Sequence, residues 1–107
     1  AKATSNICTA QVLLAVIAGM YAVYHGPSGI RDIATRIHNA TRLLAAALAD
    51  LGLKVHHDDV FDTLRVSSEN MEAILKHAEQ TKINLRSFED GSVGIALDET
   101  VFESDLA

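Results

Sequence analysis

Tryptophan is absent from this sequence, and aromatic residues of any kind are scarce. Among the 107 residues are two Tyr and three Phe, so aromatics make up 5% of a chain that is 49% hydrophobic. A core must therefore be built from Ala, Val, Leu and Ile. A single Pro and six Gly exclude a collagen-like or low-complexity chain, and 21% charged residues is ordinary for a globular domain. The length is typical of one small domain.

The sequence also contains few basic residues and a single cysteine. Nine Lys and Arg stand against fourteen Asp and Glu, for a net charge of −5. This balance argues against a nucleic-acid-binding protein, and it does not favour binding to an anionic membrane. The single cysteine, Cys8, excludes an internal disulfide and is typical of a protein from a reducing compartment. Near a helix start, this thiol is either structural or redox-sensitive with a lowered pKa.

No charged side chain occurs between Lys2 and Arg31, and this stretch contains the apolar run Val12–Tyr24. The run is shorter than the about 20 residues that span a bilayer, and the polar residues before it do not fit a signal peptide. The pattern predicts a helix covered by protein on nearly every side. A chain of this size can barely supply that cover, so we expect it to be a piece of a longer protein with a missing partner domain.

Hydrophobic periodicity and the positions of capping residues, Gly and Pro predict two long helices followed by short strands and helices. The first helix is expected from Thr4–Asn6 to His25–Gly26, and the second from Pro27 to Gly52, with Gly at each C-terminal turn. The predicted buried face of the second helix consists of Ile30, Ile33, Ala34, Ile37, Thr41, Leu44, Leu48 and Leu51. Arg36 and His38 are among the polar residues of the other side, which is expected to be a solvated or an interface face.

From Leu53 onward the period changes to that of short strands. A third helix is expected from the Ser68 capping position to about Lys82, with Met71, Ile74, Leu75 and Ala78 buried. Strands are predicted at 53–56, 60–66, 83–86 and 92–97, and a final helix begins at Asp98–Thr100. The predicted fold class is α+β, in which two packing helices over 1–52 precede a small, mostly antiparallel sheet with covering helices over 53–107.

No residues form a recognisable nucleophile–base pair, so no catalytic residue is assigned. The run His56–Asp59 is a poor metal site, because adjacent side chains on a strand point to opposite faces, and a solvated turn explains it better. Ser5 and Asn6, at a helix start, are candidates to bind a phosphate or carboxylate, although ordinary capping explains them too. Arg86 is a candidate carboxylate clamp, with a surface strand arginine as the alternative.

Four blocks of this sequence resemble the glycine decarboxylase P-protein family of the glycine cleavage system. In chain order, and with consistent spacing, they are Lys2–Gln11, Met20–Pro27, Ile83–Arg86 and Val93–Thr100. The resemblance covers nearly the whole chain. It implies a fold like that of the aspartate-aminotransferase-like (fold type I) pyridoxal-phosphate enzymes, with this chain at the end of the N-terminal half, including the small C-terminal domain.

The resemblance also implies a cofactor, partners and sites. The whole enzyme would decarboxylate glycine on pyridoxal phosphate and pass the aminomethyl group to the lipoyl arm of H-protein. The cofactor-binding lysine of the family lies in the catalytic half, so Lys2 is not that lysine and this segment is structural and interfacial. Ser5, Asn6 and Thr9 would approach the cofactor phosphate across an interface, and Arg86 would hold the substrate carboxylate.

Two alternatives stay open from the sequence. One is the small domain of another pyridoxal-phosphate aminotransferase or lyase, and the other is a free-standing dimerisation or binding module. Partners are expected to be the catalytic half of the P-protein, fused or separate, and lipoyl H-protein, with no nucleic acid, membrane or metal. The expected location is the bacterial cytoplasm, or the mitochondrial matrix for a eukaryotic source.

Overall fold

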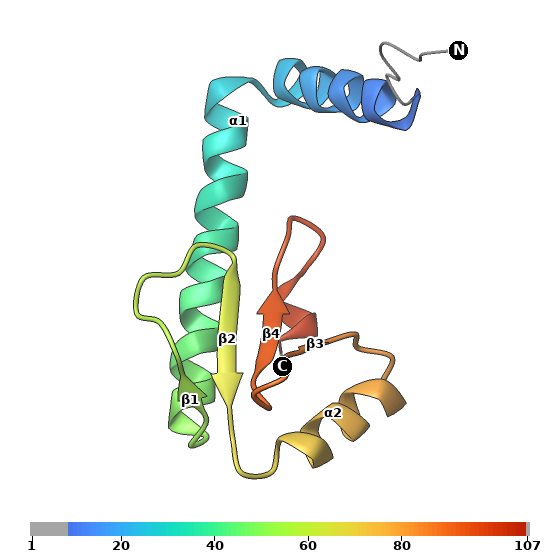
Figure 1. The fold of residues 1–107 in the computed structure, drawn as a ribbon. Coiled ribbons are helices and arrows are strands. Elements are labelled where there is room, and N and C mark those ends of the chain that lie inside the picture. Colours follow the sequence, from blue (N-terminus) through green and yellow to red (C-terminus); the bar gives the residue numbers. More distant parts are fainter. Residues whose placement is uncertain (1–8, 107) are drawn as a thin grey trace, which may run out of the picture. The chain divides into compact units, whose positions relative to one another are not determined.

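The computed structural model describes residues 9–106, and the contacts divide the chain into one unit that ends at Ile33 and one that begins at Ala34. Figure 1 shows the elements in chain order. The division predicted at residue 52, between the packing helices and the sheet domain, stays a prediction. It is based on a change of sequence pattern, whereas the division at Ile33 is based on contacts between residues.

Helix α1 (Thr9–Asp50) contains both predicted long helices, because only one residue interrupts it. Gly26 has φ 63° and ψ 178°, a non-helical conformation that is essentially restricted to glycine. Pro27 follows directly, where its missing N–H costs no hydrogen bond because it starts the next helical segment. The predicted helix end at His25–Gly26 is therefore confirmed, and the predicted start at Thr4–Asn6 lies outside the described residues.

The end of α1 is a Schellman motif. The N–H of Leu53 donates to the carbonyl of Leu48 (2.9 Å), and the N–H of Gly52 donates to that of Ala49 (2.9 Å). Gly52 has φ 86°, so the predicted glycine at the C-terminal turn is confirmed. Leu51 was expected on the buried face, but it lies past the last helical residue and is exposed, which corrects that prediction.

The strands form one antiparallel sheet in the order β1-β2-β4-β3. Their bounds are Lys54–Val55 (β1), Thr63–Ser67 (β2), Arg86–Ser87 (β3) and Val93–Ala96 (β4). In the central pair Leu64 is opposite Ile95 and Val66 is opposite Val93. Since opposed residues share a face, these four apolar side chains point to one side of the sheet.

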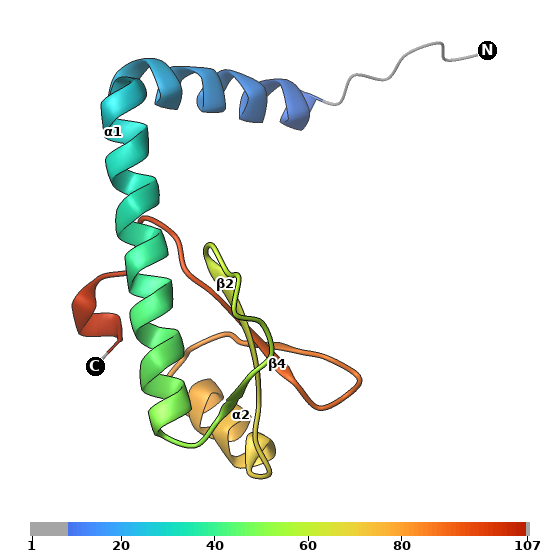
Figure 2. The same cartoon turned by 90° about the vertical axis from the view of Figure 1, so that its left-hand side faces the viewer.

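The core lies between that face and two helices, α2 (Met71–Gln80) and the second segment of α1. Leu64, Val66, Met71 and Val93 are its buried members, and Leu44 and Leu48 of α1 with Ile74 and Leu75 of α2 pack against them. Figure 2 shows both helices on one side of the strands. The α+β class with a small antiparallel sheet and covering helices is confirmed, as is the predicted apolar face of α2, where Ala78 is also buried.

Two residues predicted on the polar face of α1 are only half-exposed, because the later chain packs against them. The Arg36 guanidinium donates to the carbonyls of Glu99 (2.6 Å) and Val101 (3.1 Å). His38 stacks on Phe61 with ring centroids 5.8 Å apart. Helical periodicity does not show such contacts, since both side chains are drawn inward by segments distant in sequence.

Several predicted element bounds are wrong. The strand expected over 60–66 begins at Thr63, and the strand expected over 83–86 is shifted to Arg86–Ser87. Within residues 98–106 there is no α-helix: Asp98 accepts hydrogen bonds from the backbone N–H (2.8 Å) and hydroxyl (2.6 Å) of Thr100, and only the 3₁₀ turn η1 (Glu103–Asp105) follows. The Asp side chain here closes a local turn, a common alternative to helix capping.

At the start of α2, Ser68 accepts a hydrogen bond from the backbone N–H of Asn70 (3.3 Å), and the N-cap residue is Asn70.

Candidate functional site

The face of the sheet opposite the core carries a row of residues across three strands. Arg65 on β2 and Arg86 on β3 are both in register with Gly94 on the strand between them. Because side chains alternate along a strand, Arg65 points away from the face that buries its neighbours Leu64 and Val66. The two arginines therefore flank a position that has no side chain.

The ring of Phe88 occupies the space above Gly94. A Cβ at residue 94 would lie 3.2 Å from Cε2 of Phe88, so a larger residue there would displace the ring. The ring is held by the turn that joins β3 to β4: the N–H of Phe88 donates to the carbonyl of Ser92 (2.9 Å), and the N–H of Gly91 donates to that of Phe88 (3.0 Å). Gly91 has φ 77°, as in hairpins whose turn is followed by a G1 bulge.

Arg65 stands on one side of this ring and is fully engaged with the turn. Its Cζ lies 4.5 Å from the Phe88 ring centroid, within cation–π distance. Nη2 of Arg65 donates to Oδ2 of Asp90 (2.7 Å), and its Nε donates to Oγ of Ser92 (2.8 Å). The charge of Arg65 is thus balanced by a carboxylate from the same hairpin.

Asp90 contacts both Arg65 and Ser92 in this turn. Its Oδ1 accepts hydrogen bonds from the hydroxyl (2.6 Å) and backbone N–H (3.1 Å) of Ser92, while Oδ2 faces Arg65. These donors stabilise the ionised carboxylate, so the two Ser92 hydrogen bonds and then the Arg65 charge lower the pKa of Asp90 below its ordinary 3.8. The Asp90 carboxylate in this turn therefore stays ionised to a lower pH than an isolated aspartate.

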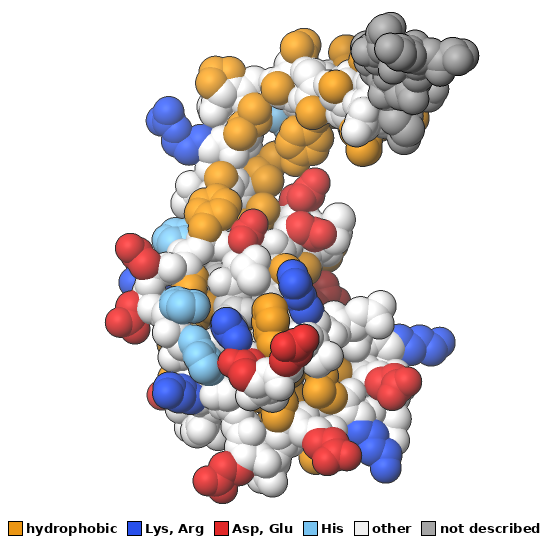
Figure 3. Space-filling view, viewed as in Figure 1, with side chains coloured by type: hydrophobic (Ala, Val, Ile, Leu, Met, Phe, Trp, Pro, Cys, Tyr) orange, Lys and Arg blue, Asp and Glu red, His pale blue; other side chains and the backbone are white. Residues whose placement is uncertain are grey.

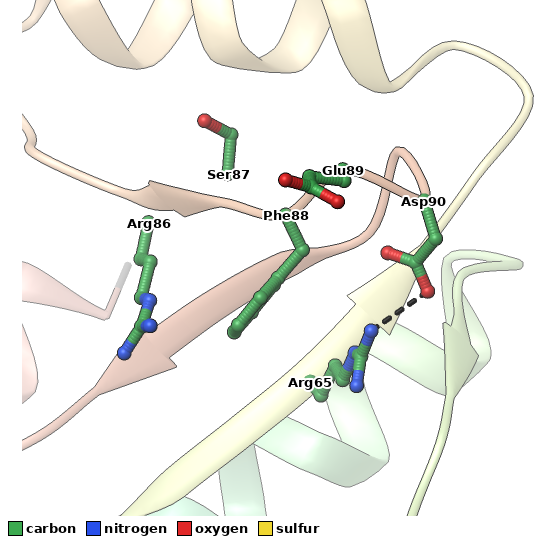
Figure 4. Close-up of a pocket in the computed structure, with 6 residues that line it drawn as sticks. All are labelled: Arg65, Arg86, Ser87, Phe88, Glu89 and Asp90. Carbon is green, nitrogen blue, oxygen red and sulfur yellow. Dashed lines mark hydrogen bonds and ion pairs between the residues drawn. The ribbon is translucent and has the colours of Figure 1, made fainter.

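Arg86 lies on the other side of Phe88, as Figure 4 shows, with Cζ 4.9 Å from the ring centroid. In the described part of the chain its guanidinium has no hydrogen-bond or ion-pair partner, whereas Arg65 has two. The hollow around the ring has a volume of about 510 Å³ and is lined by Arg65, Arg86, Ser87, Phe88, Glu89 and Asp90. We call the stack of Arg65, Phe88 and Arg86 the arginine–phenylalanine stack.

This arrangement can bind an anion. A guanidinium presents paired N–H donors that match a carboxylate or a phosphate. The described lysines, Lys54, Lys76 and Lys82, are all exposed. In residues 11–106 no buried lysine is therefore available to bond pyridoxal phosphate, and the described residues do not fit that cofactor by themselves.

The sequence-predicted site residues are not assembled into one site by the described structure. Ser5 and Asn6 lie outside the described residues, and Thr9 is described only as the first residue of α1. Arg86 lies on the open face of the sheet, as expected for a strand arginine with a free guanidinium. Sequence reasoning missed Arg65, Phe88 and Asp90. Arg65 could have been found as a lone charge between buried apolar residues, but the pairing of β2 with β4 is needed to place it near Arg86.

His56, which sequence reasoning placed in a solvated turn, is half-buried at the end of β1. Its Nε2 lies 2.9 Å from Oγ of Ser67 on the paired strand β2. The rings of His56 and His57 are 6.4 Å apart and tilted by 52°. This geometry fits two side chains that diverge.

The apolar part of α1 before Gly26 is the second candidate functional feature. All residues from Gln11 to Tyr24 are exposed, which Figure 3 shows as hydrophobic side chains gathered along this helix. We call this segment the exposed apolar helix, and its large side chains are Val12, Leu13, Leu14, Val16, Ile17, Met20, Tyr21, Val23 and Tyr24. At about 100° per residue they cover more than half of the helix circumference, and the remaining arc carries Ala15, Ala18, Gly19 and Ala22.

Helix α1 from Gln11 to Asp50 is long and apolar enough to be a candidate membrane span by length and composition only, with a mean hydropathy of 1.3 over an 18-residue window. From Thr9, the first described residue, to the interruption at Gly26, the apolar part of α1 is about 25 Å long at 1.5 Å per residue, against about 30 Å of bilayer hydrocarbon.

Known proteins of one family are similar to this chain over its whole length. The family model of the glycine cleavage system P-protein matches residues 1–107. A glycine dehydrogenase (decarboxylating) of Thermosynechococcus vestitus is 58% identical over 108 residues, which cover 99% of this chain and 11% of that protein. The mitochondrial glycine dehydrogenase (decarboxylating) of Homo sapiens is 53% identical over 106 residues, covering 98% of this chain and 10% of that protein.

A glycine dehydrogenase (decarboxylating) of Salmonella paratyphi B is 55% identical over 106 residues, which cover 99% of this chain and 11% of that protein. The chain thus spans about a tenth of the length of the curated relatives it matches. The resemblance expected from the four sequence blocks is confirmed over the full chain. With the family model matching every residue from 1 to 107, this chain belongs to the glycine cleavage system P-protein family.

Proposed function

We propose that this chain is a segment of a glycine-decarboxylating P-protein. The complete enzyme decarboxylates glycine and transfers the aminomethyl group to lipoyl H-protein; bound pyridoxal phosphate supplies the electron sink for the decarboxylation. The observation that carries this proposal is the family match over the whole chain, combined with its span of about a tenth of its relatives.

Within that enzyme the segment is structural and interfacial. We place it at the end of the N-terminal half, with the sheet unit as a small domain of the fold type I pyridoxal-phosphate enzymes. The exposed apolar helix supports this role, since Tyr24 is 85% and Leu14 is 65% exposed, and soluble proteins rarely expose so large a contiguous apolar surface. We infer that the rest of the polypeptide covers this helix.

The functional residues of this segment stay proposals. Ser5, Asn6 and Thr9 would approach the cofactor phosphate across an interface, since the free backbone N–H groups of a helix N-terminus favour an anion. Arg86 would bind a carboxylate, and the substrate carboxylate is the first candidate. The lysine that bonds the cofactor would belong to the catalytic half.

The proposed partners are the catalytic half of the P-protein and lipoyl H-protein. The proposed location is the bacterial cytoplasm, or the mitochondrial matrix in a eukaryote, and the relatives include both bacterial and mitochondrial proteins. The match to one family over the whole chain favours this assignment over the small domain of another pyridoxal-phosphate enzyme.

The test is to capture the native protein from its source with an antibody to residues 1–107, reduce it with borohydride, and locate pyridoxyl-lysine by mass spectrometry. The expected result is a chain several times longer, or a co-purifying partner chain, labelled at a lysine outside this segment. Glycine-dependent release of CO₂ in the presence of lipoyl H-protein should accompany the label.

A native chain of only this size, without label, partner or activity, would contradict the proposal. It would leave a free-standing dimerisation module, in which the exposed apolar helix is covered by a second copy. Sedimentation of that chain would then show a defined dimer.

A further inference from the structure

We infer that Phe88, flanked by the Asp90-anchored Arg65, holds the Arg86 guanidinium as a preorganised carboxylate-binding group. The inference rests on the proposed function, because it deepens the role of Arg86 there. It adds three positioning residues, Phe88, Arg65 and Asp90, that no sequence motif indicates.

The first step is that Phe88 limits the freedom of Arg86. Arginine has many rotamers, and a ligand that binds a mobile guanidinium loses affinity to its ordering. Here the guanidinium lies 4.9 Å from the Phe88 ring centroid. The ring is itself held over the bare Gly94 by the turn hydrogen bonds of Phe88 to Gly91 and Ser92. The direction of the Arg86 donors is thereby set before a ligand arrives.

The second step is electrostatic. Two guanidinium groups on opposite sides of one ring repel each other unless one of them is neutralised. The 2.7 Å ion pair of Arg65 with Asp90 supplies this neutralisation, and the Ser92 hydrogen bonds keep Asp90 ionised. Arg86 is then the one member of the stack, within the described residues, whose charge is free to attract an anion.

The third step concerns the ligand. The paired N–H donors of a guanidinium fit the two oxygens of a carboxylate, and the neighbouring carboxylate of Glu89 forms no hydrogen bond or ion pair with either arginine in the described structure. Two sources share this chemistry: the carboxylate of glycine, and an Asp or Glu side chain from another part of the enzyme. The experiment distinguishes them.

The test uses the complete P-protein that contains this segment, with its cofactor and lipoyl H-protein. The variants are Arg86→Ala, Phe88→Leu and Phe88→Tyr, where Leu removes the aromatic face and Tyr retains it. Asp90→Asn tests the electrostatic step separately, because it leaves Phe88 in place and removes the carboxylate that pairs with Arg65. The readouts are KM and kcat for glycine and the thermal midpoint of the enzyme.

If glycine is the ligand, Arg86→Ala raises KM by about tenfold or more, as expected for a lost hydrogen-bonded charge, with a smaller effect on kcat. Phe88→Leu raises KM by about two- to fivefold, the size of a cation–π contact at an exposed site, and Phe88→Tyr restores it. If a protein carboxylate is the ligand, KM is unchanged, and Arg86→Ala and Phe88→Leu lower the thermal midpoint whereas Phe88→Tyr does not.

The inference is overturned if Phe88→Leu and Phe88→Tyr behave alike in both readouts while Arg86→Ala has an effect. It is equally overturned if Arg86→Ala changes neither readout. Both results leave the proposed function intact, because the pyridoxyl-lysine label and the glycine-dependent activity are measured in the unmodified protein. Loss of those two properties in the unmodified protein would contradict the proposed function instead.

Discussion

The exposed apolar helix and the sheet unit use similar residues in opposite ways. Both are rich in Leu, Val and Ile, but Leu64 of the sheet is 0% exposed whereas Leu14 of the helix is 65% exposed. The sheet unit brings its apolar side chains together across β2, β4, α1 and α2, whereas the side chains of residues 11–24 are exposed.

The difference shows that hydrophobic content alone does not make a core. In the sheet unit, polar residues alternate with apolar ones, so one face is buried and the other is free for the arginine–phenylalanine stack. The exposed apolar helix has no polar face, because large residues and small residues between them occupy its whole circumference. Such a helix needs another surface to cover it, and we propose that the longer protein supplies this surface.

The largest expected effect separates the two regions directly. Leu64→Ala removes a buried side chain from the core and should destabilise the sheet unit by about 2–5 kcal/mol. Leu14→Ala in the same chain should change its free energy of unfolding by less than about 0.5 kcal/mol. Denaturant unfolding of both variants measures this. In the complete enzyme Leu14→Ala should also become costly, and a neutral effect there would contradict the proposed burial.

The next effect concerns the small-residue arc of the exposed apolar helix. Ala22→Leu should be nearly neutral in the 107-residue chain, where residue 22 is exposed. In the complete enzyme it should cost about 1–3 kcal/mol, because a close neighbouring surface leaves no room for the added atoms. The thermal midpoints of both forms provide the comparison, with Gln11→Leu on the same arc as a control for added hydrophobicity. Equal effects in the two forms would show that nothing covers this arc.

A smaller effect is expected at the interruption of α1. Gly26→Ala places a Cβ on a backbone with φ 63° and ψ 178°, and should destabilise the native state by about 1–2 kcal/mol although nothing lies within 4 Å of the added atom. Circular dichroism through a thermal transition measures the loss. Ser28→Ala, two residues later in the helix, is the matched control. An increase in helicity without loss of stability would mean that the interruption is not required.

The smallest expected effect is the pH dependence contributed by the sheet unit. The hydrogen bonds from Ser92 and the charge of Arg65 lower the pKa of Asp90, and those from Thr100 lower that of Asp98. A carboxyl group with a lowered pKa in the folded state stabilises the fold above its unfolded pKa, near 3.8, and this contribution disappears as the pH falls through the lower folded value. Asp90→Asn should therefore flatten the acid limb of a stability–pH curve, and Asp59→Asn at an exposed turn should leave it unchanged.

Particular elements show how far the sequence predicts this fold. The helix end at Gly26, the glycine turn at Gly52 and the buried face of α2 follow from local rules and are confirmed. The expected final helix after Asp98 is wrong, because the same Asp side chain can close a turn as well as cap a helix. Arg36 and His38 were predicted on a solvated or interface face, and helical periodicity could not identify the distant segments that contact them.

The sequence by itself determined the α+β class and the family, since these follow from periodicity and from matched blocks. The missing charge around residues 12–24 predicts a partner there, which stays a prediction. Arg86 could be singled out from the sequence as a carboxylate clamp. Only the tertiary structure decided that Phe88 and Arg65 stand beside it. That juxtaposition depends on the register of three strands and on the space above Gly94, and both are properties of strand pairing between residues far apart in the chain.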